Sequence, residues 1–253
     1  MKAALVQYSP EWENPENNII TLDGIIKNNI SDEDLIIFPE MTLTGFTMHS
    51  EKFAEELDGL GTQFFMNLAS RLGKHIFAGI IEKDDDTFFN TLLHIDPKGL
   101  IAARYRKIHP FSYAKEDKYF TPGEEIVITK VNGIKAGLTI CYDLRFPELY
   151  RKYGKEKVDL IINIANWPVN RIHHWSHLLK SRAIENLCYL IGVNRTGKDP
   201  YNKYDGSSAV YNPMGEEILF MGNNDVIGSI EFNIEYVNEI RKKFPFLEDI
   251  RLV

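Results

Sequence analysis

The sequence predicts an α/β protein, because segments typical of strands alternate with segments typical of helices along its 253 residues. Strand-like runs, rich in Val, Ile, Phe and Tyr and bounded by turn residues, cover positions 2–9, 34–40, 75–83, 91–96, 126–131, 134–143, 158–166, 189–195, 207–212 and 228–233. Helix-like stretches lie between them, at positions 15–29, 51–73, 146–156, 173–187 and 234–244. No Pro/Gly/Ser-rich linker or low-complexity tract divides the chain, so we expect a single domain over residues 1–253.

In the first half of the chain, charged residues follow two strand-like runs. DLIIFPE (34–40) has the composition of a buried strand and ends at Glu40. RYRKIHPF (104–111) places Lys107 in a basic stretch after a further strand. Between them, the turn sequence DPKG (96–99) predicts a hairpin connection.

The second half repeats this pattern around a cysteine. In GLTICYDLRFPELY (137–150) an apolar run delivers Cys141 to a Tyr-Asp turn, and Pro147 lies where the first turn of a helix can begin. A side chain at such a corner protrudes, and the amides near the helix start can lower a thiol pKa and stabilise an oxyanion. The turn sequence NPMG (212–215) predicts a second hairpin.

The two halves also share a short internal similarity. DLIIFPE and DLIINIANWP (159–168) open with the same buried-strand sequence, and a helix-like segment follows each. Both would end at the same edge of a sheet, where α/β proteins commonly place their sites. We therefore expect two similar halves that face each other, with Glu40 and Asn166 at comparable positions and Asn166 in contact with the substrate.

Composition narrows the functional classes. The chain has 29 basic and 36 acidic side chains, a net charge of −7 that argues against nucleic acid as a partner. Its longest apolar stretches fall far short of the roughly 20 residues that cross a membrane. Cys141 and Cys188 form no Cys-x-x-Cys pair, so neither a disulfide scaffold nor a zinc ribbon is expected. The sequence reaches Gln7 and Tyr8 too soon for a signal-peptide core, and we expect a cytoplasmic protein.

Glu40, Lys107 and Cys141 supply what amide hydrolysis by a thiol requires. Cys141 would attack the carbonyl, while Glu40 would take the thiol proton, return it to the leaving amine and then activate water. Lys107 would stay cationic, favour the thiolate and stabilise the oxyanion beside the backbone N–H of Tyr142. Buried together, the three groups would titrate as a coupled set.

Each of these residues has a simpler explanation when it is taken alone. A lone cysteine is often a small buried hydrophobe. Glu40 fits a helix-start carboxylate, since it follows Pro39, and Lys107 fits a solvated basic face. The sequence cannot decide between these explanations, because it does not show which residues are close in space.

Other thiol or metal enzymes fit the sequence less well. A class I glutamine amidotransferase has a Gly-x-Cys-x-Gly elbow, where this chain has Thr139 and Asp143. A papain-like enzyme needs a catalytic histidine, and the sequence contexts of His109, His173, His174 and His177 favour structural roles. The same His173-His174-x-x-His177 spacing lacks the glutamate of His-Glu-x-x-His, so no metal is expected.

The segments FPEMTLTGF, YRKIHPF and CYDLRFPELY, in this order, resemble the three motif blocks of the nitrilase, or carbon–nitrogen hydrolase, superfamily. The resemblance runs from the first strand to the last helix. In that superfamily the three blocks carry the catalytic glutamate, lysine and cysteine, which correspond to Glu40, Lys107 and Cys141. A second glutamate supports the lysine and the substrate, and in KEDKYFTPG it corresponds to Glu116, with Asp117 as the alternative.

The resemblance also implies the architecture. Members of the superfamily fold as a four-layer α-β-β-α sandwich, commonly pair as homodimers, and need no metal or organic cofactor. This fold agrees with the alternation of strands and helices read from the sequence.

Further segments narrow the resemblance to one branch. Cys-Tyr-Asp-Leu-Arg-Phe-Pro-Glu looks like the amidase branches, whereas true nitrilases usually carry Cys-Trp-Glu. ANWPVNRIHHWSHLLKSRAIEN, NRTGKD and RKKFPFLEDIRL are similar to the ω-amidases, which hydrolyse the side-chain amide of 2-oxoglutaramate and 2-oxosuccinamate. The alternatives are an N-carbamoyl or aliphatic amide hydrolase with the same three residues, and a non-catalytic binding partner on the same fold.

A dicarboxylate monoamide carries a carboxylate at the end opposite its amide, and a bidentate arginine is its natural partner. Arg145, Arg171 and Arg195 are available, and Arg171 is preferred because it follows Asn166-Trp167-Pro168 at a strand end. Each arginine also fits a structural ion pair. Four apolar side chains are expected to form the pocket walls, or else to belong to the core: Phe46, Met48, Tyr142 and Trp167.

Overall fold

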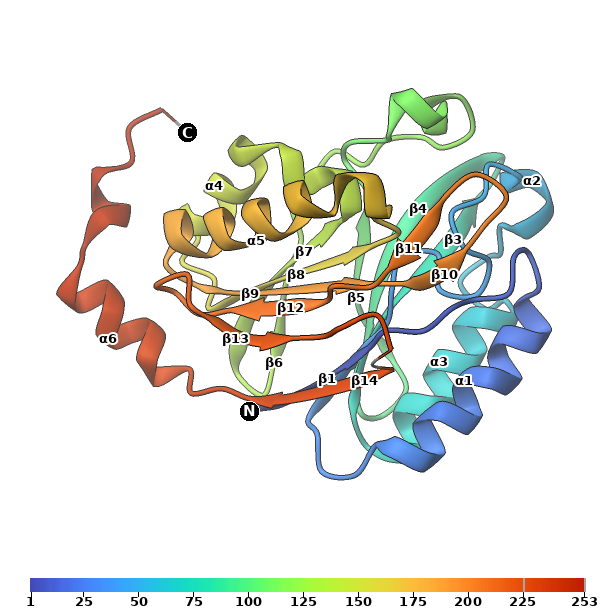
Figure 1. The fold of residues 1–253 in the computed structure, drawn as a ribbon, viewed down its shortest axis with the longest axis horizontal. Coiled ribbons are helices and arrows are strands. Elements are labelled where there is room, and N and C mark those ends of the chain that lie inside the picture. Colours follow the sequence, from blue (N-terminus) through green and yellow to red (C-terminus); the bar gives the residue numbers. More distant parts are fainter. Residues whose placement is uncertain (225, 253) are drawn as a thin grey trace.

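The computed structural model describes residues 1–224 and 226–252. They form two six-stranded sheets that pack face to face, with helices on both outer faces (Figure 1). The predicted four-layer α-β-β-α sandwich is therefore confirmed. The first sheet is covered by α1 (Pro15–Asn29) and α3 (Leu60–Leu72), and the second by α4 (Pro147–Lys155) and α5 (Ile172–Asn186).

The first sheet combines strands of the N-terminal half with one strand from the end of the chain. Its order is β14-β1-β2-β3-β4-β5, in which β1, β2 and β3 are parallel and the remaining pairs antiparallel. The bounds are β1 Lys2–Val6, β2 Leu35–Ile37, β3 His75–Asp84, β4 Thr87–Ile95, β5 Ile101–Arg106 and β14 Ile227–Glu231.

The second sheet has the order β13-β12-β9-β8-β7-β6, with β7, β8 and β9 parallel. The middle strand of the parallel trio is β2 in the first sheet and β8 in the second, and these are the two strands that share the DLII sequence. The similarity of the two halves is thus confirmed. The bounds are β6 Ile128–Val131, β7 Ile134–Ile140, β8 Leu160–Ala165, β9 Tyr189–Asn194, β12 Ala209–Tyr211 and β13 Glu217–Phe220.

The central strands are apolar at every position because both of their faces are buried. Side chains of a strand alternate between faces, so Leu35 and Ile37 of β2 pack between the sheets, while Ile36 packs beneath α1 and α3. In β8, Ile162 lies between the sheets and Ile161 beneath α4 and α5. All five side chains are fully buried. This packing fixes the ends of β2 and β8, from which the site is built.

The helix predicted over residues 51–73 is wrong in its middle. The structure has a short α2 (Ser50–Phe53), an extended segment, and then α3. In the gap, the main chain of Glu55 pairs with the C-terminal end of β3, at Ile81 and Lys83. The Glu55 carboxylate accepts the backbone N–H groups of Gly61 and Thr62, at 2.8 and 2.6 Å. Because this carboxylate satisfies the free amides at the start of α3, a new helix begins here and α2 does not continue into it.

Several short strands were not predicted. The hairpin of β10 (Thr196–Lys198) and β11 (Lys203–Asp205) is too short and polar to give a strand signal. Strand β13 has a largely apolar sequence, EILF, but is only four residues long. The two predicted hairpin turns are confirmed, because residues 96–99 connect β4 to β5 and residues 212–215 connect β12 to β13.

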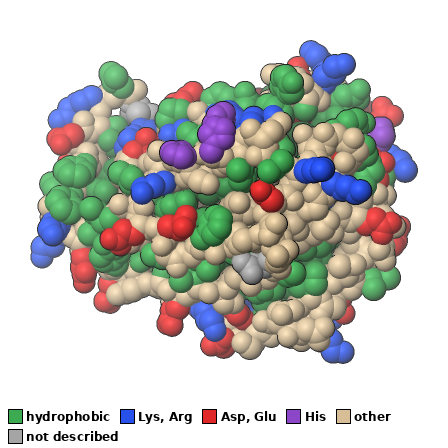
Figure 2. Space-filling view, viewed as in Figure 1, with side chains coloured by type: hydrophobic (Ala, Val, Ile, Leu, Met, Phe, Trp, Pro, Cys, Tyr) green, Lys and Arg blue, Asp and Glu red, His purple; other side chains and the backbone are tan. Residues whose placement is uncertain are grey.

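The last helix, α6 (Glu235–Lys243), lies away from the sandwich faces, at the left of Figure 1. Within the described part of the chain, no helix is both long enough and apolar enough to cross a bilayer. Figure 2 shows one face of the molecule, on which acidic and basic side chains are interspersed and a group of histidines lies beside basic residues.

A pair of histidines connects the two sheets. His75 at the start of β3 and His94 on β4 are 2.9 Å apart at Nδ1 and Nε2, and His94 Nδ1 lies 2.7 Å from the hydroxyl of Thr129 on β6. The His94 ring also stacks on Phe77, 4.4 Å between centroids. Burial and the neighbouring His75 lower the pKa of His94 to about 3, so both rings fit this contact in the neutral form.

From this pair we expect the packing of the two sheets to become less stable at acidic pH. Because the pKa of His94 lies below its unfolded value of about 6.5, its contribution to stability is present above pH 6.5 and is lost as the pH falls toward 3. We expect the free energy of unfolding in urea to drop by about 2 kcal/mol more between pH 7.5 and pH 5 in the native protein than in His94→Gln. His177→Gln, a change on the exposed face of α5, should leave that drop unchanged. Equal pH dependence in the native protein and His94→Gln would contradict this account.

Candidate active site

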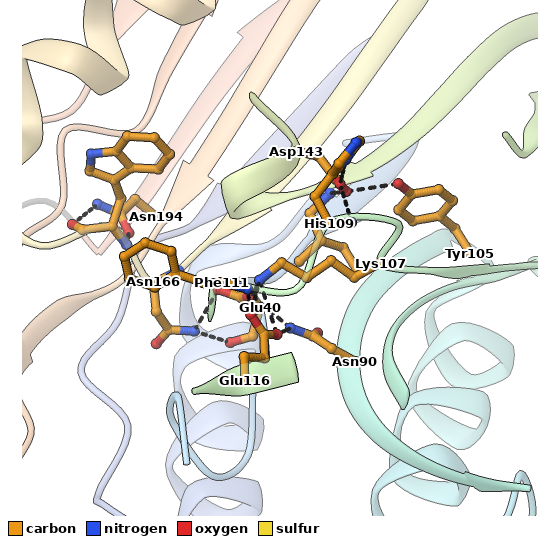
Figure 3. A network of polar contacts seen from close by, with 12 residues as sticks. Glu40, Asn90, Tyr105, Lys107, His109, Phe111, Glu116, Asp143, Asn166 and Asn194 are labelled. Carbon is orange, nitrogen blue, oxygen red and sulfur yellow. Dashed lines mark hydrogen bonds and ion pairs between the residues drawn. The ribbon is translucent and has the colours of Figure 1, made fainter. Parts of the chain in front are cut away.

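The three residues predicted at strand ends meet at one edge of the sandwich. Glu40 follows β2, Lys107 follows β5, and Cys141 follows β7. Figure 3 shows the side chains of Glu40 and Lys107 converging, with Glu116 beside them. Glu116 belongs to a short turn of 3-10 helix (Glu116–Lys118) in the segment that connects the two sheets.

Lys107 lies between two carboxylates. Its Nζ is 2.9 Å from Glu40 Oε1, and 3.1 and 2.9 Å from the two carboxylate oxygens of Glu116. All three side chains are buried. Glu116 Oε2 also accepts the backbone N–H of Phe111 at 2.5 Å, so the second glutamate is held by the segment that carries it.

Asn166 holds the other side of Glu40. Its backbone N–H donates to Glu40 Oε2 at 2.9 Å, and its side-chain Nδ2 donates to the main-chain oxygen of Glu40 at 2.7 Å. Gly79 on β3 lets the loop after β2 approach, because a Cβ there would stand 2.8 Å from Cα of Glu40 and 2.6 Å from the nitrogen of Met41. The predicted correspondence of Glu40 and Asn166 is therefore a direct contact between the two halves.

Burial and charge together set the protonation states. Burial opposes ionisation of both Glu40 and Lys107, but their attraction outweighs it. This attraction, with hydrogen bonds from Asn90 and Asn166, lowers the pKa of Glu40, and with the charge of Glu116 it raises the pKa of Lys107. Burial and the charge of Glu40 raise the pKa of Glu116, although Lys107 acts in the opposite direction. Glu40 is thus ionised at neutral pH, and Lys107 is an ammonium.

Cys141 lies at the corner where β7 ends and a 3-10 helix, η3 (Cys141–Arg145), begins. Its φ of 46° is a strained left-handed value for a residue with a side chain, and such values cluster at functional sites. Burial, Glu40 and Glu116 raise the pKa of the Cys141 thiol, against the opposing effects of Lys107 and the N–H of Asn166. The expectation of a lowered thiol pKa is therefore wrong, and the resting group is a neutral thiol beside an ionised carboxylate.

Asp143 fixes this corner. Its carboxylate accepts the backbone N–H of Ile140 at 2.9 Å, the hydroxyl of Tyr105 at 2.7 Å, and both the backbone N–H and Nδ1 of His109, at 3.1 and 2.7 Å. The ring of His109 stacks on Phe146, 3.7 Å between centroids. His109 therefore helps to hold the turn at Cys141 through Asp143 and Phe146. This agrees with the structural role that the sequence favoured for it.

A cavity of about 630 Å³ opens above Cys141. All seven residues predicted to contact the substrate line it: Phe46, Met48, Tyr142, Arg145, Asn166, Trp167 and Arg171. The hairpin of β10 and β11, which the sequence missed, contributes Asp199, Tyr201, Asn202 and Tyr204 to the same cavity.

Two of the three predicted arginines lie in the cavity, and neither forms an ion pair with a carboxylate in residues 1–224 or 226–252. The guanidinium of Arg145 stacks 4.8 Å from the ring of Trp167, and that of Arg171 lies 5.5 Å from the ring of Phe111. Burial and the charge of Arg171 lower the pKa of Arg145, so the two cations are close enough to repel each other. An anionic group bound between them would relieve this repulsion.

The prediction that Arg195 can bind the substrate carboxylate is wrong. Its side chain is fully buried outside the cavity, stacks 4.5 Å from the ring of Tyr204, and donates to the main-chain oxygens of Thr196 and Lys198, at 3.0 and 3.2 Å. These contacts hold the β10–β11 hairpin in place.

Three polar residues of the site were missed by the sequence analysis, namely Asn90, Asp143 and Asn194. Asn194 accepts the N–H of Trp167 at 2.7 Å and donates to the oxygen of the same residue at 2.9 Å, which fixes the loop after β8. The sequence does contain a signal for Asn194. It is the last residue of β9, and so lies at a strand end, as Asn166 does just after β8. In the described residues, no group of three or more His, Cys, Asp and Glu side chains is arranged to hold a metal ion.

Comparison with known proteins gives the same fold and related sequences. The sequence model of the carbon-nitrogen hydrolase family matches residues 2–242. The chain is 32% identical over 250 residues to a 2-oxoglutaramate amidase of Bacillus subtilis, covering 97% of this chain and 96% of that protein. It is 31% identical over 251 residues to the omega-amidase YafV of Escherichia coli K12, covering 98% and 96%.

A solved structure is also closely similar. XC1258 of Xanthomonas campestris, described as a CN-hydrolase superfamily protein with an arsenic adduct in its active site, superposes with a TM-score of 0.95 at 30% identity, covering 100% of this chain and 98% of that one. The fold is thus that of the nitrilase superfamily, as the resemblance implied. The chain belongs to the carbon–nitrogen hydrolase family, and it is an enzyme of the amidase kind.

Proposed function

We propose that this amidase hydrolyses the side-chain amide of short dicarboxylate monoamides, such as 2-oxoglutaramate and 2-oxosuccinamate, and releases ammonia. The observation that carries the proposal is the pair Arg145 and Arg171, two cations that no carboxylate of the described residues pairs with, in the cavity that also contains Cys141. A substrate with a carboxylate opposite its amide would bind the arginines at one end and present the amide to the thiol at the other. The names of the relatives from Bacillus subtilis and Escherichia coli also support it.

In the proposed reaction, Cys141 and Glu40 act together on the amide. Glu40 takes the thiol proton as the sulfur attacks the carbonyl carbon, because the resting thiol has a raised pKa and Glu40 is ionised. The negative charge that forms on the carbonyl oxygen is stabilised by the ammonium of Lys107 and the N–H of Tyr142, which lies in the first turn of η3. Glu40 then gives the proton to the leaving nitrogen, and the C–N bond breaks to leave a thioester and ammonia.

The second half of the reaction uses the same base. Glu40 takes a proton from water as the water attacks the thioester, and the thiolate of Cys141 leaves and recovers that proton. Glu116 is proposed to hold Lys107 by its two contacts at 3.1 and 2.9 Å, so that the ammonium faces the oxyanion throughout. The three buried charges titrate as a set, so the pH profile reports the set and no single residue.

A substrate panel tests the proposal. Purified protein is assayed for ammonia release from 2-oxoglutaramate, 2-oxosuccinamate, succinamate, glutamine, an N-carbamoyl amino acid and butyramide. We expect the keto-acid amides to be hydrolysed fastest and glutamine slowly, since an added ammonium next to the carboxylate would face Arg145 and Arg171. Turnover of the N-carbamoyl compound or of butyramide alone would reject the proposed substrates and favour the alternative amide hydrolases.

Replacement of the arginines tests how the carboxylate binds. For Arg171→Gln we expect kcat/KM with 2-oxosuccinamate to fall about 10-fold to 100-fold, mainly through KM, because charge-assisted hydrogen bonds to a carboxylate are lost. Arg145→Gln should behave similarly. With butyramide, which has no carboxylate, kcat/KM should stay within about 3-fold of the native value. An equal loss on both substrates would show that the arginines shape the cavity and do not bind the carboxylate.

A further inference from the structure

Asn90 contacts all three charged residues of the site. It lies on β4 and is buried, and its side-chain Nδ2 is 2.7 Å from Glu40 Oε1 and 2.8 Å from Glu116 Oε1. Its main-chain oxygen accepts the backbone N–H of Lys107 at 2.8 Å. Figure 3 shows the Asn90 amide directed at the carboxylates.

The amide of Asn90 and the ammonium of Lys107 share the same acceptors. Oε1 of Glu40 and Oε1 of Glu116 each receive one contact from Nδ2 and one from Nζ. An amide nitrogen has two hydrogens, so one is available for each carboxylate. Asn90 Oδ1 has no hydrogen-bond partner in the described structure, and turning the amide over would place this oxygen against two carboxylates. The two donor contacts therefore determine the orientation.

We propose that Asn90 is a positioning residue that keeps Glu40 available as the base. It satisfies Oε1 of Glu40 with a donor that does not titrate. This leaves Oε2, which receives the backbone N–H of Asn166 at 2.9 Å and a longer contact from its Nδ2 at 3.3 Å, as the oxygen that takes the proton of Cys141. Without the amide, a single proton shared between Glu40 and Glu116 would satisfy both carboxylates, and Glu40 would stop acting as a base. This inference rests on the proposed function, since it assigns Asn90 a part in the same reaction.

The pKa directions at the site agree with this role. The Asn90 amide favours the ionised form of both glutamates, and burial opposes it. Removal of the amide should therefore raise the pKa that governs the acid side of the pH profile.

Asn90→Ala tests the inference through the pH dependence of Cys141. We expect the acid limb of kcat/KM, and of Cys141 alkylation by iodoacetamide, to move up by about one pH unit. The value of kcat should fall about 10-fold to 100-fold, with KM within about 3-fold of the native value. The alkylation rate is followed by mass spectrometry of the Cys141 peptide.

Asn163 on β8 offers a matched control. It is also buried, its Nδ2 also makes two contacts, with the hydroxyls of Thr139 and Tyr150 at 3.0 and 2.9 Å, and its Oδ1 also has no hydrogen-bond partner. It contacts no carboxylate. Asn163→Ala should therefore lose a similar amount of thermal stability while its acid limb stays at the native pH.

The outcomes separate the inference from the proposed function. If Asn90→Ala and Asn163→Ala have the same acid limb as the native protein, Asn90 is structural and the inference is rejected. If the native protein hydrolyses none of the panel amides, the proposed function fails, but the alkylation profile still decides the role of Asn90. Should Asn90→Ala not fold, Asn90→Ser, which keeps one donor hydrogen, is compared with Asn163→Ser and is expected to show a smaller upward shift.

Discussion

Replacement of Cys141 with alanine is expected to abolish amide hydrolysis, with a loss in kcat of about 10⁴-fold or more. The sulfur is the atom that forms the bond to the carbonyl carbon in the proposed reaction, and the other groups of the site cannot replace it. Glu40, Lys107 and Glu116 would still bind and polarise the amide, which leaves only a small residual rate. Ammonia release at saturating 2-oxosuccinamate measures the effect.

Cys188 provides the control for this experiment, because it is the second free cysteine and is fully buried beneath α5, away from the cavity. Cys188→Ala should keep native kcat and lose only the stability expected for a small void, about 1 kcal/mol. Iodoacetamide should inactivate the native protein and Cys188→Ala alike. Full activity of a correctly folded Cys141→Ala protein would reject the thiol mechanism.

Replacement of Lys107 with methionine is expected to damage both catalysis and stability. The change removes the cation between Glu40 and Glu116 and leaves two buried carboxylates facing each other. Breaking a buried ion pair from one side costs about 3–5 kcal/mol, and loss of the oxyanion's cation should reduce kcat about 10²-fold to 10³-fold or more. Urea denaturation and ammonia release measure the two effects separately.

The stability of Lys107→Met should decrease as the pH rises. Without the ammonium, burial and mutual repulsion raise the folded pKa of the glutamate pair above its unfolded value of about 4.3. Stability is then greatest below that unfolded pKa and is lost as the pH rises through the folded pKa. The stability difference between the native protein and the variant should therefore shrink as the pH falls from 8 to 5.

Lys118→Met is the matched control, since Lys118 forms an exposed ion pair with Asp117 at 3.2 Å. Such a surface pair contributes less than about 1 kcal/mol, and its removal should change neither kcat nor the pH dependence. If Lys107→Met were as stable as Lys118→Met across this pH range, the two glutamates would not both carry charge in the native site.

The sequence was sufficient to predict the positions of Glu40 and Cys141 because each follows a largely buried, apolar strand, β2 or β7, whereas Lys107 follows β5, a half-exposed edge strand. Parallel strands of a sheet end at the same edge, so residues just beyond them are brought together whatever the loop lengths. Asn166 lies beside Glu40 although β2 and β8 belong to different sheets, because the sheets pack face to face with these two strands ending at the same edge of the sandwich. Strands buried on both faces are also easy to recognise, since every position is apolar, and this is why the α/β fold class could be predicted, whereas the four-layer sandwich was implied by the family resemblance.

Asn90 could not be found in this way. It lies inside β4, at a position where a single polar residue in a strand would ordinarily be expected to face solvent. Only the approach of Glu40 from the loop after β2 and of Glu116 from the segment after β5 turns that position into a buried polar site. The error over Arg195 has the same origin, because its sequence neighbours cannot show that the guanidinium points under the β10–β11 hairpin.

The hydrogen bonds between Asn166 and Glu40 join residues 126 positions apart, one from each sheet. Neither half of the chain can orient the glutamate by itself, however well its own strands are formed. Catalytic activity therefore requires the two halves to pack together, and formation of their secondary structure alone does not produce it. During refolding, amide hydrolysis should return only after the strands have formed and the two halves have packed together. The recovery of activity therefore measures the last step of folding.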